Sequence, residues 1–281
     1  MLEGRSVTRA SGKKYKGARQ STSLTSGGLA ELPDRTLACR YEMKYHITET
    51  QAAAIAEFVK PFVQLDRYCK LQPSRDYPIV SMYLDSGDLR LCRESLTGHK
   101  NRFKLRIRSY TDEPEYPRFF EIKRRMNTII IKSRARVMDP DVETLLAGLP
   151  LPPQNYTADI DTINQFQLYA SSVRAKPTVL VRYMRQAYEG DGQNRVRVTF
   201  DRDLAYNITN AAQVRLGGGG WQRNPFTMGG VILEIKFTDR YPAWLGRLVR
   251  HFNLRTRSIS KYASSLQDSC ALRFCAPEMM V

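Results

Sequence analysis

Six short segments of this sequence carry a charged residue at every second position, and this pattern restricts the fold more than any other feature. Side chains alternate between the two faces of a β-strand, so each segment turns its charges to one face of a sheet and its apolar residues to the other. Most of these charges are positive, which predicts a sheet with one basic face. The segments are Arg40–Lys44, Lys104–Arg108, Glu121–Lys123, Lys132–Arg134, Arg195–Arg197 and Glu234–Lys236.

The positive charge belongs mainly to the folded part of the chain. The 281 residues have a formal net charge of +16 at pH 7. Residues 1–38 hold seven Lys/Arg and three Asp/Glu, a net of +4, which leaves +12 for the remainder. A potential of this sign concentrates anions such as nucleotides, polyphosphate, nucleic acid or an acidic membrane surface. Composition does not choose among these partners.

The cysteines and the apolar segments indicate a cytoplasmic protein. The cysteines form an odd, scattered set without a C-x-x-C pair, which argues against a disulfide framework and against a zinc site. The N-terminus has no apolar signal region, and no run of about 18 apolar residues occurs. We therefore expect a cytoplasmic location, and association with the inner face of a membrane would need a partner protein. The cysteines are Cys39, Cys69, Cys92, Cys270 and Cys275.

The sequence predicts a disordered basic leader over residues 1–38 and one folded domain over 39–281. The leader is rich in Ser, Gly, Thr, Lys and Arg and poor in large apolar residues, so it cannot offset the entropy cost of ordering. The domain alternates groups of strands with a few helices, which is typical of an α+β fold with a mostly antiparallel sheet, open or closed.

The expected elements follow from periodicity and from capping signals. After the first charged segment, strands are expected at Ile79–Asp85, Arg102–Tyr110, Pro117–Met126, Ile129–Val137, Thr178–Tyr188, Asn194–Asp203 and Val231–Phe237. Helices are expected at Thr48–Asp66 with an interruption at Pro61, and at Asp139–Ala147, Asp159–Val173, Pro242–Asn253 and Ser260–Phe274.

The basic face recurs on several strands, and this favours an anion-binding surface over a solvated one. Lys104, Arg106 and Arg108 share one face of their strand, while Leu105 and Ile107 share the other. Like charges that lie side by side repel, so several such strands on one surface destabilise it unless anions bind there. The same face returns at Lys132, Arg134, Arg195 and Arg197, and singly at Lys123 and Lys236.

Three glutamates lie two residues before a lysine on the same face: Glu42, Glu121 and Glu234. A carboxylate among phosphate-binding cations is a suitable ligand for Mg²⁺ or Mn²⁺, which prefer oxygen donors and also bind substrate phosphates. Each glutamate could equally be a salt-bridge partner that orders the neighbouring Lys and Arg. For Glu42 and Glu121 both interpretations stay open.

Aromatic residues make up 10% of the chain and do not form the stacking pairs of a single-strand binder. Such binders stack successive bases on aromatic side chains. We therefore expect no nucleic-acid partner.

Taken in order, these residues resemble one family, the VTC domain, which is the catalytic core of polyphosphate polymerases within the triphosphate tunnel metalloenzyme group. The resemblance runs from about Arg40 to Ser265. It rests on Arg40-x-Glu42-x-Lys44-Tyr45, Ser81–Ser86, Lys104–Tyr110, Phe120–Lys123, Lys132–Arg134, Arg182-Tyr183-x-Arg185-x-Ala187-Tyr188, Arg197–Asp201, Leu233–Lys236 and Ser260–Tyr262.

The resemblance implies a closed, mostly antiparallel β-barrel with surrounding helices, whose tunnel transfers the γ-phosphoryl group of ATP to a growing polyphosphate chain with Mn²⁺ or Mg²⁺. By position, phosphates would be held by Lys44, Arg106, Arg108, Lys123, Lys132, Arg185, Arg197 and Lys261. Arg40, Lys104, Arg134 and Lys236 are further expected substrate-binding residues. Glu234 is the favoured metal ligand, with Glu42 and Glu121 as the other candidates.

Two departures from the family bear on these expectations. Hydrolases and adenylyl cyclases of the superfamily open with Glu-x-Glu-x-Lys, whereas Arg40 stands at the first position here. This difference favours the polymerase branch. The eukaryotic polymerases add a regulatory domain and membrane helices, and the chain resembles a stand-alone bacterial-type version.

The expected partners are ATP and inorganic polyphosphate, with a membrane protein as a further one. The alternatives are a triphosphate hydrolase on the same barrel and a non-catalytic polyphosphate- or nucleotide-binding module.

Overall fold

The computed structural model describes residues 40–127, 129–152, 158–190, 196–225, 229–238 and 240–271. The leader predicted for residues 1–38 lies outside these residues, as do Arg195 and the expected end of the last helix beyond residue 271. The side chain of Arg40 is also outside the described part, although its backbone belongs to the first strand.

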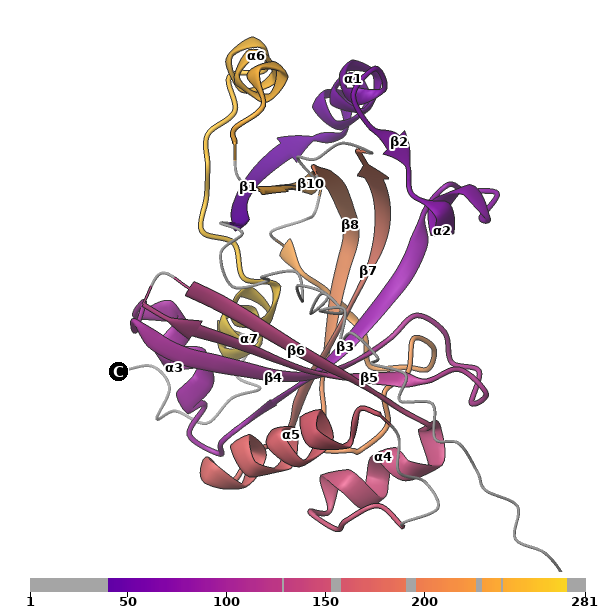
Figure 1. The fold of residues 1–281 in the computed structure, drawn as a ribbon, viewed down its shortest axis with the longest axis vertical. Helices are drawn as coiled ribbons and strands as arrows, with labels where there is room; N and C mark the ends of the chain where they lie inside the picture. Colours follow the sequence, from indigo (N-terminus) through magenta and orange to yellow (C-terminus); the bar gives the residue numbers. More distant parts are fainter. Residues whose placement is uncertain are drawn as a thin grey trace, which may run out of the picture. The chain divides into compact units, whose positions relative to one another are not determined.

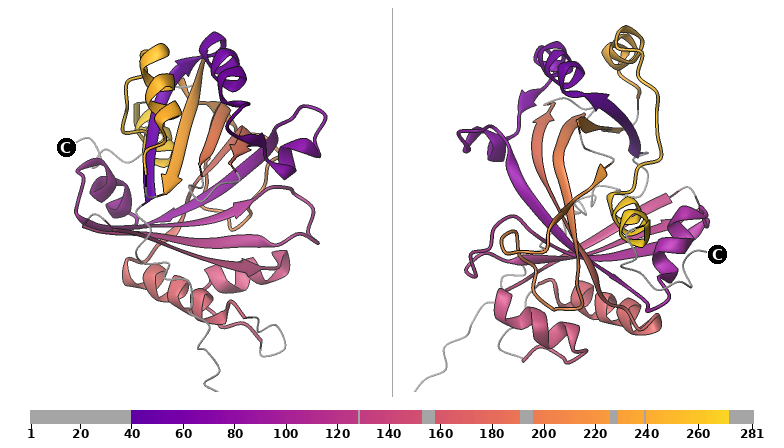
Figure 2. Two further views of the ribbon diagram at one scale, coloured as in Figure 1. Left: turned by 45° about the horizontal axis from the view of Figure 1, so that its top comes forward. Right: turned by 180° about the vertical axis from the view of Figure 1, so that it is seen from behind.

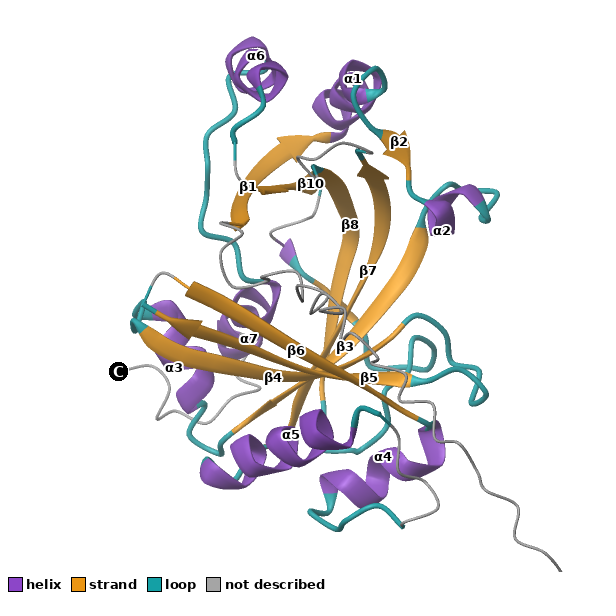
Figure 3. Ribbon diagram, in the orientation of Figure 1, coloured by secondary structure: helices purple, strands orange, loops and turns teal. Residues whose placement is uncertain are grey.

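One ten-stranded antiparallel sheet is the centre of the fold (Figures 1 and 3). Its main path runs β1-β10-β8-β7-β3-β4-β5-β6, while β2 pairs with β7 and β9 pairs with β8. The strands are β1 (Arg40–Thr48), β2 (Gln64–Leu65), β3 (Tyr77–Asp85), β4 (Asn101–Ser109), β5 (Arg118–Met126), β6 (Ile129–Val137), β7 (Lys176–Glu189), β8 (Arg197–Ile208), β9 (Gln222–Arg223) and β10 (Gly230–Thr238).

Seven helices of the described residues surround this sheet. They are α1 (Glu49–Val59), α2 (Arg67–Lys70), α3 (Arg90–Leu96), α4 (Asp139–Leu146), α5 (Ile160–Ser172), α6 (Ala243–His251) and α7 (Lys261–Ala271). The α+β class and the antiparallel sheet are confirmed. The predicted strands and helices are also present, although their ends shift by a few residues.

The first helix is shorter than expected, and two helices escaped prediction. Thr48 and Gln51 form the predicted capping box of α1, but the helix ends at Val59 because Pro61 cannot continue it. α2 and α3 are short. The amide groups at the start of α3 are capped from outside the helix by Asp85, which accepts hydrogen bonds from the backbone of Leu91 at 2.8 Å and Cys92 at 2.9 Å.

Helices lie against the outer face of the sheet (Figure 2), and apolar residues pack between helices and sheet in two clusters. α1 and α6 pack on β1, β10 and β8 through Ile55, Leu245 and their neighbours. α4 and α5 pack on β3, β4, β5 and β6, where Phe166 meets Phe120 with ring centroids 4.8 Å apart. A third cluster joins α7 to the inner face of β3 and β7 through Tyr262 and Leu266.

The expected closed barrel is wrong for the described residues, because backbone hydrogen bonds do not join the edge strands β1 and β6. A chain segment occupies part of the free edge instead. The amide of Arg257 donates to the carbonyl of Lys44 at 2.8 Å, and the Lys44 ammonium donates to the carbonyl of Ile259 at 3.1 Å. On the other side, Lys104 donates to Ser260 Oγ at 3.1 Å. We call residues 257–260 the seam segment.

Phe166→Ala should lower the free energy of unfolding by about 3–5 kcal/mol, because it empties a buried site between α5 and the sheet. Phe166 is 1% exposed, whereas Leu168 on the same helix is 70% exposed. Urea unfolding followed by circular dichroism measures the effect. Leu168→Ala is the matched control and should stay within about 0.5 kcal/mol of the parent protein. Equal losses in both variants would contradict the packing of α5.

Candidate phosphate-binding site

The inner face of the sheet carries the charges that the alternating pattern placed on one side. We call this set the ionic belt. Its cations are Lys44, Lys104, Arg106, Arg108, Lys123, Lys132, Arg134, Arg185, Lys236 and Lys261, and its carboxylates are Glu42, Glu121, Asp201 and Glu234. More than two cations are present for each carboxylate, so the belt as a whole is positive.

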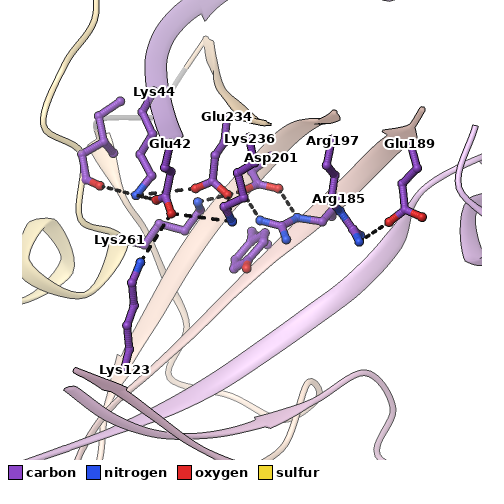
Figure 4. Close-up of polar contacts among 12 residues, drawn as sticks. Glu42, Lys44, Lys123, Arg185, Glu189, Arg197, Asp201, Glu234, Lys236 and Lys261 are labelled. Carbon is purple, nitrogen blue, oxygen red and sulfur yellow. Dashed lines mark hydrogen bonds and ion pairs between the residues drawn. The ribbon is translucent and has the colours of Figure 1, made fainter. Parts of the chain in front are cut away.

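Glu42 and Glu234 share two lysines at one end of the belt (Figure 4). Lys44 Nζ lies 2.8 Å from Glu42 Oε1 and 3.5 Å from Glu234 Oε2. Lys236 contacts both carboxylates, and it lies 3.8 Å from Glu42. Lys123, which comes from β5, reaches Glu42 at 3.5 Å. This last contact joins the two edge regions of the sheet through side chains.

Burial and the neighbouring charges shift the pKa values of Glu42, Glu234 and Lys44 in opposite directions. Burial by itself raises the pKa of Glu42 and Glu234, but the surrounding lysines outweigh it and lower both values below the ordinary 4.5. Burial likewise lowers the pKa of Lys44, yet Glu234 and Glu42 raise that value to about 12. Both carboxylates and Lys44 are therefore charged at neutral pH.

Asp201 forms a second group in the middle of the belt. Arg185 grips it with two hydrogen bonds, Nε to Oδ1 at 2.7 Å and Nη2 to Oδ2 at 2.8 Å. Lys261, the first residue of α7, lies 2.7 Å from Oδ2. Burial alone raises the pKa of Asp201, but Arg185 and Lys261 bring it below its ordinary value. The carboxylate thus fixes the direction of one arginine and one lysine at once.

Glu121 forms the third group and is 1% exposed. Arg106 Nε donates to its Oε2 at 2.6 Å, Arg134 Nε donates to its Oε1 at 2.6 Å, and Lys132 lies 2.8 Å from Oε1. Although burial raises the pKa of Glu121, these cations bring it well below the ordinary value. With three cations around it, Glu121 fits the salt-bridge interpretation better than that of a metal ligand.

Two belt cations have only neutral hydrogen-bond partners among the described residues. The buried Arg108 donates to Ser81 Oγ at 3.1 Å and to Tyr183 OH at 3.5 Å. Lys104 donates to Ser260 Oγ. Glu121 attracts Arg108 electrostatically, but it already contacts three other cations, so an anion bound beside Arg108 and Lys104 would stabilise them further.

Comparison with known proteins decides the family of this chain. The model of the VTC domain matches residues 39–269. The chain belongs to the VTC domain family. None of the curated proteins is similar enough in sequence to match it.

Solved structures similar to this VTC domain share little sequence with it. One is "a putative adenylate cyclase" from Bacillus halodurans, with 12% identity, a TM-score of 0.44, and coverage of 78% of this chain and 92% of that one. Another is the PH1819 protein from Pyrococcus horikoshii OT3, with 12% identity, a TM-score of 0.41, and coverage of 83% and 99%.

Arg197 of this VTC domain lies at the end of the row of contacts in Figure 4, apart from the three carboxylate groups. Its guanidinium contacts Glu189, lies 3.1 Å from Asp66 Oδ2 and donates to Tyr77 OH at 3.3 Å. Arg40 is placed by its backbone alone, which pairs with Thr238 of β10. The remaining predicted phosphate-binding residues and metal candidates all lie in the belt.

Sequence reasoning missed several polar residues of the inner face. Asp201 lies four residues after Arg197 on the same strand, so the alternating pattern alone could have placed it there. Thr199, opposite Glu234 in the strand pairing, is 2% exposed, and its Oγ1 has no hydrogen-bond partner among the described residues. Tyr83 and Ser260 lie in motifs of the family resemblance, but they carry no charge and the alternating pattern did not mark them as site residues.

Glu121→Gln should lower the free energy of unfolding at pH 7 by about 3–5 kcal/mol, because it removes the buried counter-ion that Arg106, Lys132 and Arg134 share. The pKa of Glu121 is held below the ordinary 4.5, so its contribution is complete above about pH 4.5 and declines as the pH falls further. Urea unfolding between pH 7 and 3 should therefore show a steeper acid decline in the parent than in the variant. Glu143→Gln, at an exposed position of α4, is the control. Parent-like stability of Glu121→Gln at pH 7 would contradict this assignment.

Binding of inorganic tripolyphosphate should weaken as the pH rises from 7 to 9. Burial lowers the pKa of both Lys104 and Lys132 from 10.5 to about 8, so each loses its positive charge over this range. Where binding requires a charged lysine, the loss of this charge between pH 7 and 9 lowers the affinity about tenfold. In isothermal titration calorimetry, Lys104→Arg should lose about one tenfold step of this pH dependence. Lys60→Arg, at the exposed residue just after the end of α1, should leave the pH dependence unchanged. The same slope in Lys104→Arg and the parent would count against a role for Lys104.

Proposed function

We propose that this VTC domain is a metal-dependent polyphosphate polymerase that transfers the γ-phosphoryl group of ATP to the end of a growing polyphosphate chain. Membership of the family supports a function on polyphosphate or triphosphate in general terms. The observation that carries the finer proposal is Arg108, a buried guanidinium with only hydroxyl partners, inside a belt where cations outnumber carboxylates. Such a surface suits a substrate with many negative charges in a row.

The residues around Glu234 fit a divalent ion. Mg²⁺ and Mn²⁺ prefer oxygen donors, and they are often held by one or two carboxylates together with substrate phosphates and water. Glu234 and Glu42 lie around the same two lysines, and the hydroxyl of Thr199 opposite Glu234 has no partner in the described structure. No group of three or more His, Cys, Asp or Glu side chains forms a metal cluster in the described ranges. We propose that Glu234, with Glu42, holds an ion whose remaining ligands come from the substrate.

The phosphates would be held by the cations of the belt. Arginine binds two phosphate oxygens through a planar fork, whereas lysine acts as a compact charge. Arg106 and Arg185 are each fixed in direction by a buried carboxylate, Glu121 and Asp201 respectively. Their carboxylates orient these side chains before substrate arrives, so less conformational entropy is lost on binding.

In the proposed reaction, an oxygen of the terminal phosphate of the chain attacks the γ-phosphorus of ATP. The bond between this phosphorus and the oxygen that bridges to the β-phosphate breaks, and ADP leaves with the electron pair. Phosphoryl transfer asks the protein mainly to align the two oxygens and to neutralise charge on the transferred group. Lys123, Lys132 and Lys261 supply such charge, and a bound divalent ion would add to it. No protein nucleophile is required.

The decisive assay follows both phosphate release and polymer. Purified protein with ATP and Mn²⁺ should yield ADP and phosphate chains that resist nucleases and are digested by exopolyphosphatase. Phosphate release without polymer would show a triphosphate hydrolase and contradict the proposal. Tight tripolyphosphate binding without turnover would show a non-catalytic binding module and contradict it as well.

Arg106→Ala and Glu234→Ala should each reduce polymer synthesis by about a thousandfold or more, which is the range for removing a charge that stabilises phosphoryl transfer. Circular dichroism and thermal unfolding show whether the variants are folded. Arg93→Ala is the control for Arg106→Ala, because Arg93 lies on α3 and pairs with Asp88 away from the belt. Parent-like synthesis in a folded Arg106→Ala or Glu234→Ala protein would reject the site assignment.

A further inference from the structure

Aromatic side chains line one end of the inner face, next to the ionic belt. Tyr77 begins β3, Tyr110 follows the end of β4, and Phe119 lies near the start of β5. Tyr68 of α2 continues the row. The ring centroids of Tyr68 and Tyr77 are 6.2 Å apart, those of Tyr77 and Tyr110 are 6.1 Å apart, and those of Tyr110 and Phe119 are 5.7 Å apart. We call these four residues the aromatic rim.

The rim follows the belt directly along β4 and β5. Tyr110 lies two residues after Arg108, and Phe119 lies two residues before Glu121, so both share the face of the belt. Contacts also join the two sets. Arg134 binds Glu121, donates to Tyr110 OH at 3.2 Å and lies 4.6 Å above the ring centre of Phe119. Arg197, which lies outside the belt, donates to Tyr77 OH at 3.3 Å.

The opposite ends of the same strands are basic. Arg102 and Arg125 face each other across β4 and β5, beyond Lys104 and Lys123. The inner face therefore has a polarity, with aromatic rings at one end, charges in the middle and further arginines at the other end. A ligand that is anionic along its whole length needs no aromatic end, whereas a ligand with a flat ring on an anionic chain matches both parts.

We propose that the aromatic rim is a nucleobase-binding subsite, so that a nucleoside triphosphate lies with its base on the rim and its phosphates on the belt. This inference rests on the proposed use of ATP and names the part of the site that distinguishes a nucleotide from an inorganic phosphate chain. Every base has a flat π-face that stacks on aromatic side chains, and arginines beside the rings add to the attraction. Tyr68 is 51% exposed, with Arg67 at 4.6 Å from its ring centre, and marks the outer end of the subsite.

The test compares two ligands by isothermal titration calorimetry in the same Mn²⁺ buffer: a non-hydrolysable ATP analogue and inorganic tripolyphosphate. The parent should bind the analogue more tightly than tripolyphosphate. Tyr68→Ala and Tyr68→Leu should each weaken binding of the analogue by about tenfold, the scale of one base-stacking contact. Both should bind tripolyphosphate within about twofold of the parent, because the belt is intact.

Tyr241→Ala is the matched control, since Tyr241 is 46% exposed and packs against Phe237, outside the rim. It should bind both ligands like the parent. Equal losses for the two ligands, or no loss for the analogue in both rim variants, would overturn the subsite. Failure to form polymer together with rim-dependent binding of the analogue would refute the polymerase proposal alone. Polymer synthesis with rim-independent binding would refute the subsite alone.

Discussion

Repulsion among like charges is the constraint on which the rest of this structure depends. Seven strands and the start of α7 bring arginines and lysines to one face, and such a surface is unstable by itself. Glu121, Asp201, Glu234 and Glu42 offset the repulsion locally, and each contacts two or more cations. The offset is incomplete. The remaining positive charge is available to a bound anion, so stability and binding arise from the same imbalance.

The carboxylates also hold the elements together in space. Asp201 of β8 fixes Arg185 of β7 and Lys261 at the start of α7, while buried Asp85 caps α3 and accepts a hydrogen bond from Tyr262. Two acids on different strands thereby fix the position of one helix against the inner face. Packing of α7 in this place covers part of that face with apolar residues and confines the exposed charge to the belt.

The alternating charges predicted β1, β4, β5, β6, β8, β10 and most of the belt, because alternation is a local property of the chain. Closure of the sheet could not be predicted in this way. It depends on whether β1 meets β6, and these strands are far apart in sequence. The directions of Arg197 and Glu121 also depend on partners from other strands. The charge pattern could not mark neutral residues such as Thr199 and Tyr83 as part of the site, since a lone hydroxyl fits an ordinary buried strand as well as a binding site. The described helices include none long and apolar enough to cross a membrane.

The seam segment gives this edge of the sheet a mechanical property that a continuous barrel does not have. In a closed barrel, a lateral opening breaks a ladder of backbone hydrogen bonds between two strands. Among the described residues, the seam is held by one backbone hydrogen bond, Arg257 to Lys44, and by side-chain contacts of Lys44, Lys104 and Lys123. Three lysines of the ionic belt thus also hold the free edge of the sheet together. A bound anion that draws their ammonium groups away from these partners would weaken the seam and let the sheet open at this edge.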